Sequence, residues 1–207
     1  MNIKGVITGD IIKSTEIKNK SRDELLQVIK NIANDLHGIS LIRVEMYRGD
    51  SFQIVVDSAA MVLKVAILLR AKLKQNYWDA RLAIGIGSID YNSNDIVTSD
   101  GEAFKNSGRE FDAIGKRKLV VRTPWEDVNG ELKVSTAFAD NIISKWTKQQ
   151  AETIFLYLSQ KDINKKDIAG EVGKSAQAIS KLLITANESL ISDYLDRCEY
   201  IIKTKSN

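Results

Sequence analysis

The hydrophobic positions of the first 123 residues repeat with two different periods. Short alternating or apolar runs, typical of strands, are separated by two longer stretches in which apolar residues recur as on one face of a helix. In EMYRGDSFQIVV, two strand-like runs flank Gly49 and Asp50, which indicates a tight β-hairpin. The pattern predicts strands over residues 3–9, 41–48, 52–57, 80–90 and 116–123, and helices over residues 22–38 and 59–76.

This order, β-α-β-β-α-β with an extra strand, predicts an α+β fold of the ferredoxin-like type, with helices on one face of an antiparallel sheet. The strand pattern ends at Pro124, and the later stretches have helical periodicity. We therefore expect a mixed domain over residues 1–123, a connector helix within 124–147 and a small all-α domain over 148–207. Helices are expected at about 134–147, 149–160, 164–171, 175–186 and 188–203.

Composition narrows the class of protein. Of the 207 residues, 43% are hydrophobic and 28% are charged, as in an ordinary globular protein. The first residues lack the pattern of a secretory signal, no apolar run is long enough to cross a membrane, and the single cysteine, Cys198, cannot form an internal disulfide. We therefore expect a cytoplasmic protein with no membrane partner. The net charge of +3 permits nucleic-acid binding without requiring it.

Two carboxylates form the first candidate site. Asp10 follows the first predicted strand and Asp50 lies at the hairpin tip, and a split βαβ arrangement can bring both to one sheet edge. Two adjacent carboxylates repel, so either one is protonated or a metal bridges them; Mg²⁺ or Mn²⁺ is the expected cofactor. The alternative is an ordinary turn without function. The loop that leads from Asp10 into a helix is expected to bind phosphate through Ile11, Ile12, Lys13, Ser14 and Thr15.

These residues resemble the motifs of a known family. The segment from Asp10 to Thr15 resembles the metal-binding segment of class III nucleotidyl cyclases, and RGDSF at 48–52 resembles their second metal-binding hairpin. RLAIGIGSID and GEAFKNSGRE are similar to two further cyclase segments. With the motifs TGDI, GDSFQ and DGEAF, the chain also resembles the SatD-like family of bacterial proteins, which carries a helical domain at its C-terminal end.

The resemblance implies a nucleoside triphosphate or another nucleotide as ligand, bound by the cyclase-like domain 1–123. It also implies a homodimer, in which the arginine-bearing segment of one chain completes the site of the other. Met46 and Thr98 stand where cyclases carry the lysine and aspartate that recognise the purine, so base recognition differs here. The implied catalytic residues are Arg109, Lys105 and Asn106, with Lys105 standing where cyclases carry asparagine.

A helix-turn-helix pattern is present in NKKDIAGEVGKSAQAISKLL, at residues 164–183. Gly173 is suited to the turn, and Ile168 and Ile179 are suited to the core between the two helices. The alternative is a helical bundle that binds protein. The residues expected on the exposed, DNA-facing side are Ser175, Ala176, Gln177, Ser180 and Lys181.

The sequence supports three hypotheses. The first is a cytoplasmic bacterial regulator, in which a cyclase-like metal-nucleotide domain is coupled to a DNA-binding helix-turn-helix. The second is an active nucleotidyl cyclase or related phosphotransfer enzyme with a helical dimerisation tail. The third is a degenerate domain retained as an interaction scaffold.

Overall fold

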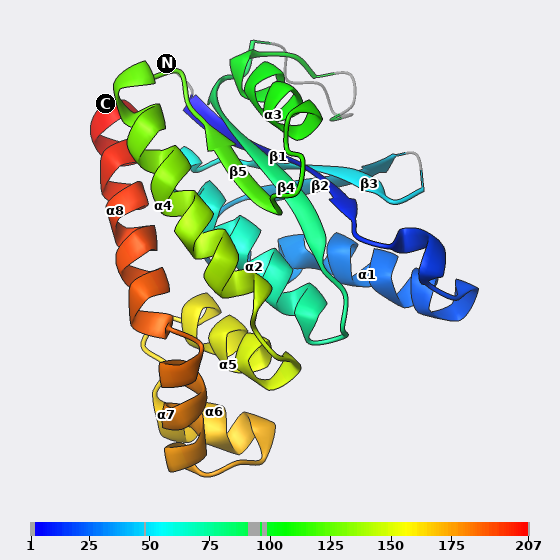
Figure 1. Ribbon diagram of the computed structural model, residues 1–207, viewed down its shortest axis with the longest axis vertical. Helices are drawn as coiled ribbons and strands as arrows, with labels where there is room; N and C mark the ends of the chain where they lie inside the picture. Colours follow the sequence, from blue (N-terminus) through cyan, green and yellow to red (C-terminus); the bar gives the residue numbers. More distant parts are fainter. Residues whose placement is uncertain (1–2, 48, 91–95, 97–98, 207) are drawn as a thin grey trace.

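In the computed structural model, five strands form one mixed sheet in the order β2-β3-β1-β4-β5 (Figure 1). The structure describes residues 3–47, 49–90, 96 and 99–206. The hairpin prediction is confirmed, because β2 and β3 are antiparallel and Tyr47 pairs with Ser51. The strands are β1 (Ile3–Ile11), β2 (Ile42–Tyr47), β3 (Ser51–Val56), β4 (Ala80–Ser88) and β5 (Leu119–Arg122).

The first four strands have the split βαβ topology that the sequence predicts. Helix α1 (Asn19–Asp35) connects β1 to β2, and β3 lies between these two strands. Helix α2 (Val62–Lys74), preceded by a short 3-10 helix η2 (Ala59–Met61), connects β3 to β4 across β1. The prediction of a purely antiparallel sheet is wrong, because β5 pairs with β4 in parallel. The α+β class is confirmed.

The prediction that helices cover one face only is also wrong. Helix α3 (Glu102–Asp112), which the hydrophobic pattern did not reveal, lies on the face opposite α1 and α2 (Figure 1). Its contact with β4 depends on Gly85, where an added Cβ would stand 2.0 Å from the Ala103 carbonyl oxygen and 2.3 Å from the Ser107 nitrogen. The glycines of β4 therefore allow a helix backbone to approach the sheet closely.

The chain after β5 is helical, as predicted. Helix α4 begins at Glu126 instead of near residue 134, because Asn129 accepts a hydrogen bond from the Thr123 backbone N–H at 2.9 Å and turns the chain directly from β5 into the helix. The C-terminal helices are α4 (Glu126–Ser144), α5 (Lys148–Ser159), α6 (Lys165–Val172), α7 (Ala176–Thr185) and α8 (Glu188–Ser206).

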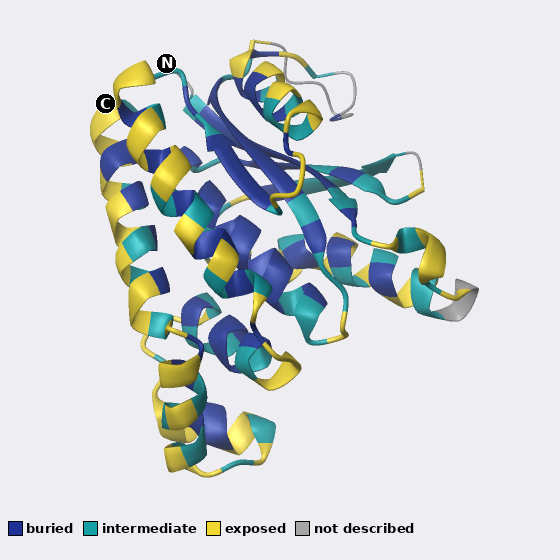
Figure 2. Ribbon diagram, viewed as in Figure 1, coloured by how far each residue is buried: buried dark blue, intermediate teal, exposed yellow. Residues whose placement is uncertain are grey.

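One hydrophobic cluster extends from the sheet to the C-terminal helices. It includes Ile7 of β1, Leu68 of α2, Ile154 of α5 and Ile202 of α8, all with no exposed surface. Figure 2 shows this buried layer between the sheet and the helices. The division into domains at residue 123 stays a prediction. Among the described helices, none is long and apolar enough to cross a membrane.

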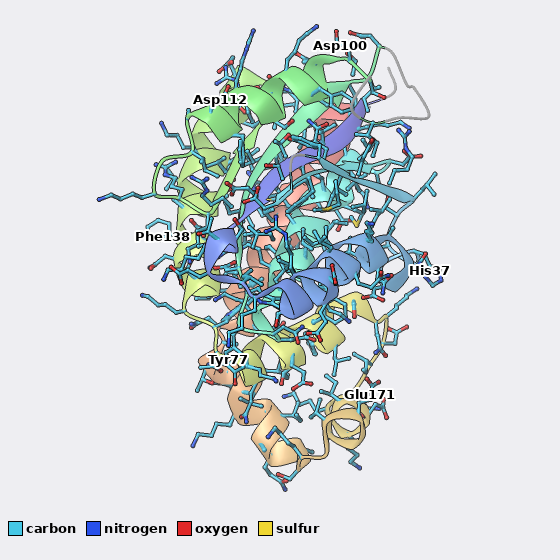
Figure 3. The ribbon with its side chains drawn as sticks, turned by 90° about the vertical axis from the view of Figure 1, so that its right-hand side faces the viewer. His37, Tyr77, Asp100, Asp112, Phe138 and Glu171 are labelled. Atoms are coloured by element: carbon cyan, nitrogen blue, oxygen red, sulfur yellow. The ribbon has the colours of Figure 1, made fainter. Side chains whose placement is uncertain are left out.

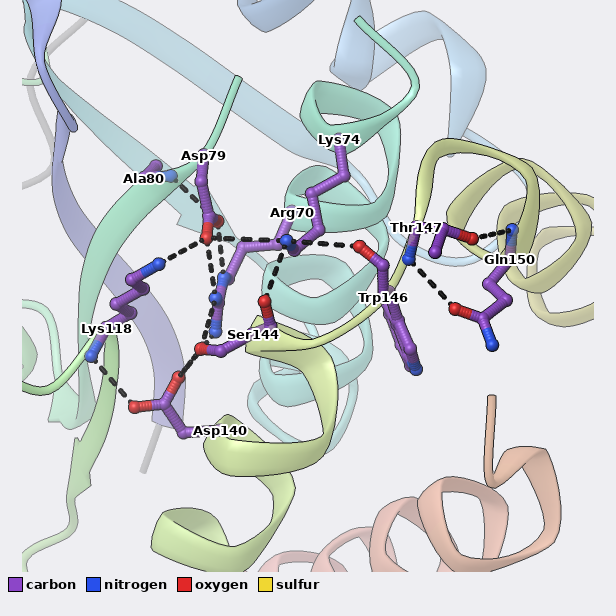
Figure 4. A network of polar contacts seen from close by, with 10 residues as sticks. All are labelled: Arg70, Lys74, Asp79, Ala80, Lys118, Asp140, Ser144, Trp146, Thr147 and Gln150. Carbon is purple, nitrogen blue, oxygen red and sulfur yellow. Dashed lines mark hydrogen bonds and ion pairs between the residues drawn. The ribbon is translucent and has the colours of Figure 1, made fainter. Parts of the chain in front are cut away.

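A buried ion network joins the sheet to α4 (Figure 4). Arg70 of α2 has no exposed surface, and its guanidinium donates to Asp79 at 2.9 and 3.0 Å, to Asp140 at 2.7 Å and to Ser144 at 3.1 Å. Lys118, just before β5, donates its ammonium to Asp79 at 3.0 Å and its backbone N–H to Asp140 at 2.9 Å. Charges taken out of water require this kind of complete pairing.

The carboxyl group of Asp79 remains ionised inside this network. Burial alone would raise its pKa, but the hydrogen bonds and charge of Arg70, with the charges of Lys74 and Lys118, outweigh burial and lower the pKa. A lowered pKa in the folded state stabilises the protein at pH values above the ordinary value of 3.8, and this contribution is lost as the pH falls through the lower value.

We expect Arg70→Ala to lower the free energy of unfolding by about 3–5 kcal/mol, because it leaves Asp79 and Asp140 buried with fewer donors. Lys64→Ala, on the same helix, is the matched control and should change it by no more than about 0.5 kcal/mol. Urea denaturation at neutral pH measures both values. Equal effects of the two substitutions would show that the network contributes little to stability.

Candidate functional site

The structure places Asp10 and Asp50 at the same end of neighbouring strands. Asp10 is the penultimate residue of β1 and pairs with Ser51, the first residue of β3, so that Asp50 directly precedes its partner. The Asp50 backbone carbonyl also accepts a hydrogen bond from the Ile11 N–H at 3.3 Å. Gly49 has φ +80°, a conformation that favours glycine at this turn. Arg48, the first residue of the RGDSF motif, lies outside the described residues.

A cation pairs with one of the two carboxylates. Arg81, the residue opposite Asp10 on β4, donates to both Asp10 oxygens, one of them at 2.9 Å. The hydrogen bond to Asp10, opposed by burial and reinforced by the charges of Asp10 and Asp50, raises the pKa of Arg81. The guanidinium also lies 5.8 Å from the centre of the Phe111 ring on α3. The sequence interpretation considered only a proton or a metal between the carboxylates and missed this cation.

The loop after Asp10 contacts the hairpin through Ser14, whose hydroxyl donates to Asp50 at 2.5 Å. The phosphate-binding role expected of Ile11 and Ile12 stays a prediction, and it cannot rest on their backbone N–H groups. Their N–H groups already bond to the carbonyls of Asp50 and Asp79, because this part of the loop continues the strand. In this loop, the N–H groups of Lys13, Ser14 and Thr15 have no such bond among the described residues. They lie at the start of the 3-10 helix η1 (Ser14–Glu16).

A cationic hollow of about 310 Å³ opens beside this loop. The KRK triplet before β5 is the sequence signal for part of it, although the sequence interpretation treated that triplet only as the start of a strand. The volume of the hollow is at the lower end of the range typical of small-molecule sites. The residues lining the hollow are Ile11, Ile12, Lys13, Arg81, Lys116 and Lys118.

The carboxylates fit a magnesium-type ion in one respect only. Mg²⁺ is commonly held by one or two protein carboxylates, with ligand phosphates and water completing the shell. Among the described residues, no group of three or more metal-binding side chains exists, so Asp10 and Asp50 would have to work with a bound phosphate. Asp10 would also have to release Arg81, since both of its oxygens accept from that side chain.

The implied catalytic residues lie on α3. Asn106 is buried and donates to the Ile86 carbonyl at 2.9 Å, which is five residues along β4 from Arg81, or about 17 Å. Lys105 is exposed and lies 3.5 Å from Asp100, which Figure 3 shows at one end of α3 with Asp112 at the other. Arg109 is also exposed. Within one chain, Asn106 and Lys105 are therefore not assembled around Asp10 and Asp50, and Thr98 lies outside the described residues.

Helices α6 and α7 are joined by a short turn. Gly173 adopts φ +65° after α6, and the Ser175 hydroxyl caps α7 by accepting from the Ala178 N–H at 3.2 Å. Ile168 and Ile179 have no exposed surface, as the helix-turn-helix pattern requires. Of the residues expected to face DNA, Ser175, Gln177 and Lys181 are exposed, and Ala176 and Ser180 are half-buried, with Ser180 accepting from Lys165 at 3.3 Å.

The single cysteine is not a candidate nucleophile. Cys198 is buried, and burial raises the pKa of its thiol to about 12, so the thiol stays protonated at neutral pH.

Comparison with known proteins gives a family and a weak structural likeness. The SatD family profile matches residues 5–196. Two solved structures of a bacterial light-regulated adenylyl cyclase are 10% and 11% identical to this chain, each with a TM-score of 0.42 over 57% of it. The matches cover 74% and 42% of those chains. No curated protein was found to match.

A double-mutant cycle measures the pairing of Asp10 with Arg81. We expect Asp10→Asn and Arg81→Gln to be coupled by about 1 kcal/mol in the free energy of unfolding, because the pair is only partly exposed and bidentate. The exposed pair Lys13–Glu16 is the matched control, and its Gln substitutions should show coupling near zero. Similar coupling in both pairs would mean that Arg81 does not hold Asp10.

Proposed function

The chain belongs to the SatD family, and we propose that it is a regulator that binds a nucleotide or a related polyphosphate at the Asp10 end of its sheet and DNA through α6 and α7. The observation that carries the proposal is the hollow beside the Ile11–Lys13 loop, which is lined by four cationic side chains, one of which, Arg81, bonds to Asp10 and interacts with the charge of Asp50. Polyphosphate is the ligand class that such a combination suits, because cations contact phosphate oxygens while carboxylates hold the accompanying divalent ion.

The cations of the hollow differ in how far they are already paired. Arg81 and Lys118 are fixed by Asp10 and Asp79, whereas the side chain of Lys13 bonds, within the described part of the chain, only to the exposed Glu16 at 3.1 Å. Lys116 is exposed and has no ion pair among the described residues. A phosphate chain would therefore meet two positioned cations and two that are free to rearrange.

A divalent ion would lie on the carboxylate side of the same site. Asp50 is better placed than Asp10 to hold it, because among the described residues only Ser14 donates a side-chain hydrogen bond to it, and only to one of its oxygens. An ion bound there would neutralise part of the negative charge of the phosphates. The released Arg81 would stay within the hollow that it lines.

The phosphates, and not the base, are expected to contribute most of the recognition. Met46, at the position implied for purine recognition, cannot donate or accept a strong hydrogen bond, and it packs partly buried against the core. Such a site would accept several nucleoside triphosphates with similar affinity.

DNA binding is the second part of the proposal, supported by the exposed face of α7. Gln177 and Lys181 lie one turn apart and are both exposed, while Ile179 and Leu183 face the core. Glutamine and lysine are side chains that read base edges or contact phosphates in a major groove. A helical bundle that binds protein is the alternative use of this surface.

An active cyclase is the alternative function for the sheet domain. In the arrangement that the cyclase motifs imply, Arg109, which is exposed on α3, would act at the site of a second chain. The homodimer implied by the cyclase motifs would supply it. Conversion of a triphosphate to a cyclic product would distinguish this enzyme from a regulator that only binds.

We expect at least one nucleoside triphosphate to raise the melting temperature of the full chain, and to raise it further with Mg²⁺ or Mn²⁺. A ligand at 100 times its dissociation constant stabilises the folded state by about 2.7 kcal/mol. Asp50→Asn should remove only the metal-dependent part of the shift. The double variant Lys13→Gln, Lys116→Gln should reduce the shift with and without metal, because each substitution removes a positive charge from the hollow.

Lys64→Gln on α2 is the control for loss of one positive charge, and inorganic tripolyphosphate is the control for base recognition. A shift that persists unchanged in the Lys13→Gln, Lys116→Gln variant would place the ligand elsewhere. The absence of any shift with every triphosphate and with tripolyphosphate would contradict the proposed ligand class.

For the α7 surface, we expect Gln177→Ala with Lys181→Ala to weaken binding to a DNA fragment selected by the wild-type chain, with an unchanged far-ultraviolet spectrum. Loss of the Lys181 charge should also reduce the steepness of log K plotted against the logarithm of the salt concentration, by about one in the slope. Fluorescence anisotropy across a salt series measures both. Lys145→Ala, outside α6 and α7, should leave binding intact. Failure of the wild-type chain to select any DNA would favour a protein partner.

A further inference from the structure

The outer edge of β5 has backbone groups without partners. Because the Leu82 N–H bonds to the Lys118 carbonyl and the parallel register continues to Gly85 and Arg122, alternate residues of β5 bond to β4. Leu119 and Val121 therefore present their N–H and C=O groups to the opposite side, where β5 is the last strand of the sheet. Within the described part of the chain, neither N–H has a hydrogen-bond acceptor.

Helix α4 lies along this edge in place of a sixth strand (Figure 1). Its residues Asn129, Lys133 and Thr136 follow one another at helical spacing and all line a cavity of about 120 Å³ against β5. Asn129 satisfies the next backbone group on the same edge, by accepting from the Thr123 N–H at 2.9 Å and donating to the Thr123 carbonyl at 3.0 Å. No side chain does the same for Leu119 or Val121 among the described residues.

The cavity wall carries an excess of positive charge. Glu110 is its one acidic residue, and it lies 3.8 Å from Arg122, whose guanidinium also pairs with Glu126 at 2.6 Å. Arg117 and Lys133 line the cavity as well, and neither has a carboxylate partner within the described residues. Both also line a second hollow on the outside of α4, so they stand at the mouth of the cavity.

We propose that the space between β5 and α4 is a binding site for a small oxyanion, held by Arg117 and Lys133 and by one outward N–H group of β5, that of Leu119 or that of Val121. A bare strand edge would not select an anion, because its carbonyls repel negative charge as its N–H groups attract it. The two unpaired cations, Arg117 and Lys133, make the site favour a negatively charged ligand. The volume is close to that of a few water molecules, so the site accepts a group of the size of phosphate or a carboxylate but not an added peptide strand.

This site is separate from the Asp10 hollow and does not depend on the proposed nucleotide function. Lys116 and Lys118 line that hollow, whereas Arg117, between them in sequence, lines the cavity at the β5 edge. The KRK triplet thus divides its charges between two sites on either side of the start of β5.

Amide proton–nitrogen spectra of the full chain, titrated separately with phosphate and with acetate against sodium chloride of equal ionic strength, test the proposal. We expect the amide signal of Leu119 or of Val121 to move in a saturable manner with one or both anions, and the responding anion identifies the source of the oxyanion. Lys133→Gln should raise the dissociation constant by about tenfold, because it removes one charge-assisted hydrogen bond. Arg117→Gln should act in the same direction.

Lys145→Gln at the C-terminal cap of the same helix is the matched control and should leave the dissociation constant unchanged. The signals of Lys13 to Thr15 report anion binding at the other hollow in the same spectra. The dissociation constant read from them must be the same in the Lys133→Gln variant and in the wild type. Signals of Leu119 and Val121 that stay fixed with both anions, or that follow chloride equally, would overturn the proposal. An equal response in Lys133→Gln and Lys145→Gln would overturn it too.

Discussion

The buried guanidinium of Arg70 is the constraint on which the arrangement of the molecule depends. A charge without exposed surface must have its donors bonded, and Arg70 meets this requirement only where α2, the start of β4 and α4 come together. Hydrophobic contacts tolerate small displacements, whereas these hydrogen bonds fix direction as well as distance. The network therefore sets the position of α4, and with it the wall of the cavity at the β5 edge.

The same network reaches the candidate ligand site through Lys118. Its ammonium bonds to Asp79 and its backbone N–H to Asp140, while its side chain lines the hollow beside Lys13. Arg81 is positioned in a similar way by Asp10 and by the Phe111 ring. Two of the four cations are thus held in place before any ligand arrives, which lowers the ordering cost of binding.

The sequence predicted those parts of the fold that follow from local pattern. The β2–β3 hairpin, the split βαβ order and the turn at Gly173 each depend on a few adjacent residues. Helix α3 was missed because its buried residues, Ala103, Asn106 and Ser107, are small or polar, while its two aromatic residues, Phe104 and Phe111, are only partly buried. The parallel pairing of β5 could not be predicted either, because it depends on the path of the chain around α3.

The site was predictable to a similar degree. Asp10 and Asp50 were identified because each lies next to a strand end with a clear pattern. Arg81 was missed as their partner because the pairing depends on the register between β1 and β4, which no local pattern shows. The family match covers residues 5–196 and therefore includes the segments that contain Asp10 and Asp50.

The packing of α8 has a consequence for the order in which the chain can fold during synthesis. Ile201 and Ile202 belong to the same core as Ile7, and α8 contacts η2, so residues from both ends of the chain close one hydrophobic layer. η2 and α2 emerge from the ribosome before α8, so the surface that α8 contacts on them is at first open to water. Contacts of such long sequence separation slow folding and leave apolar surface open to chaperones until the last helix is made.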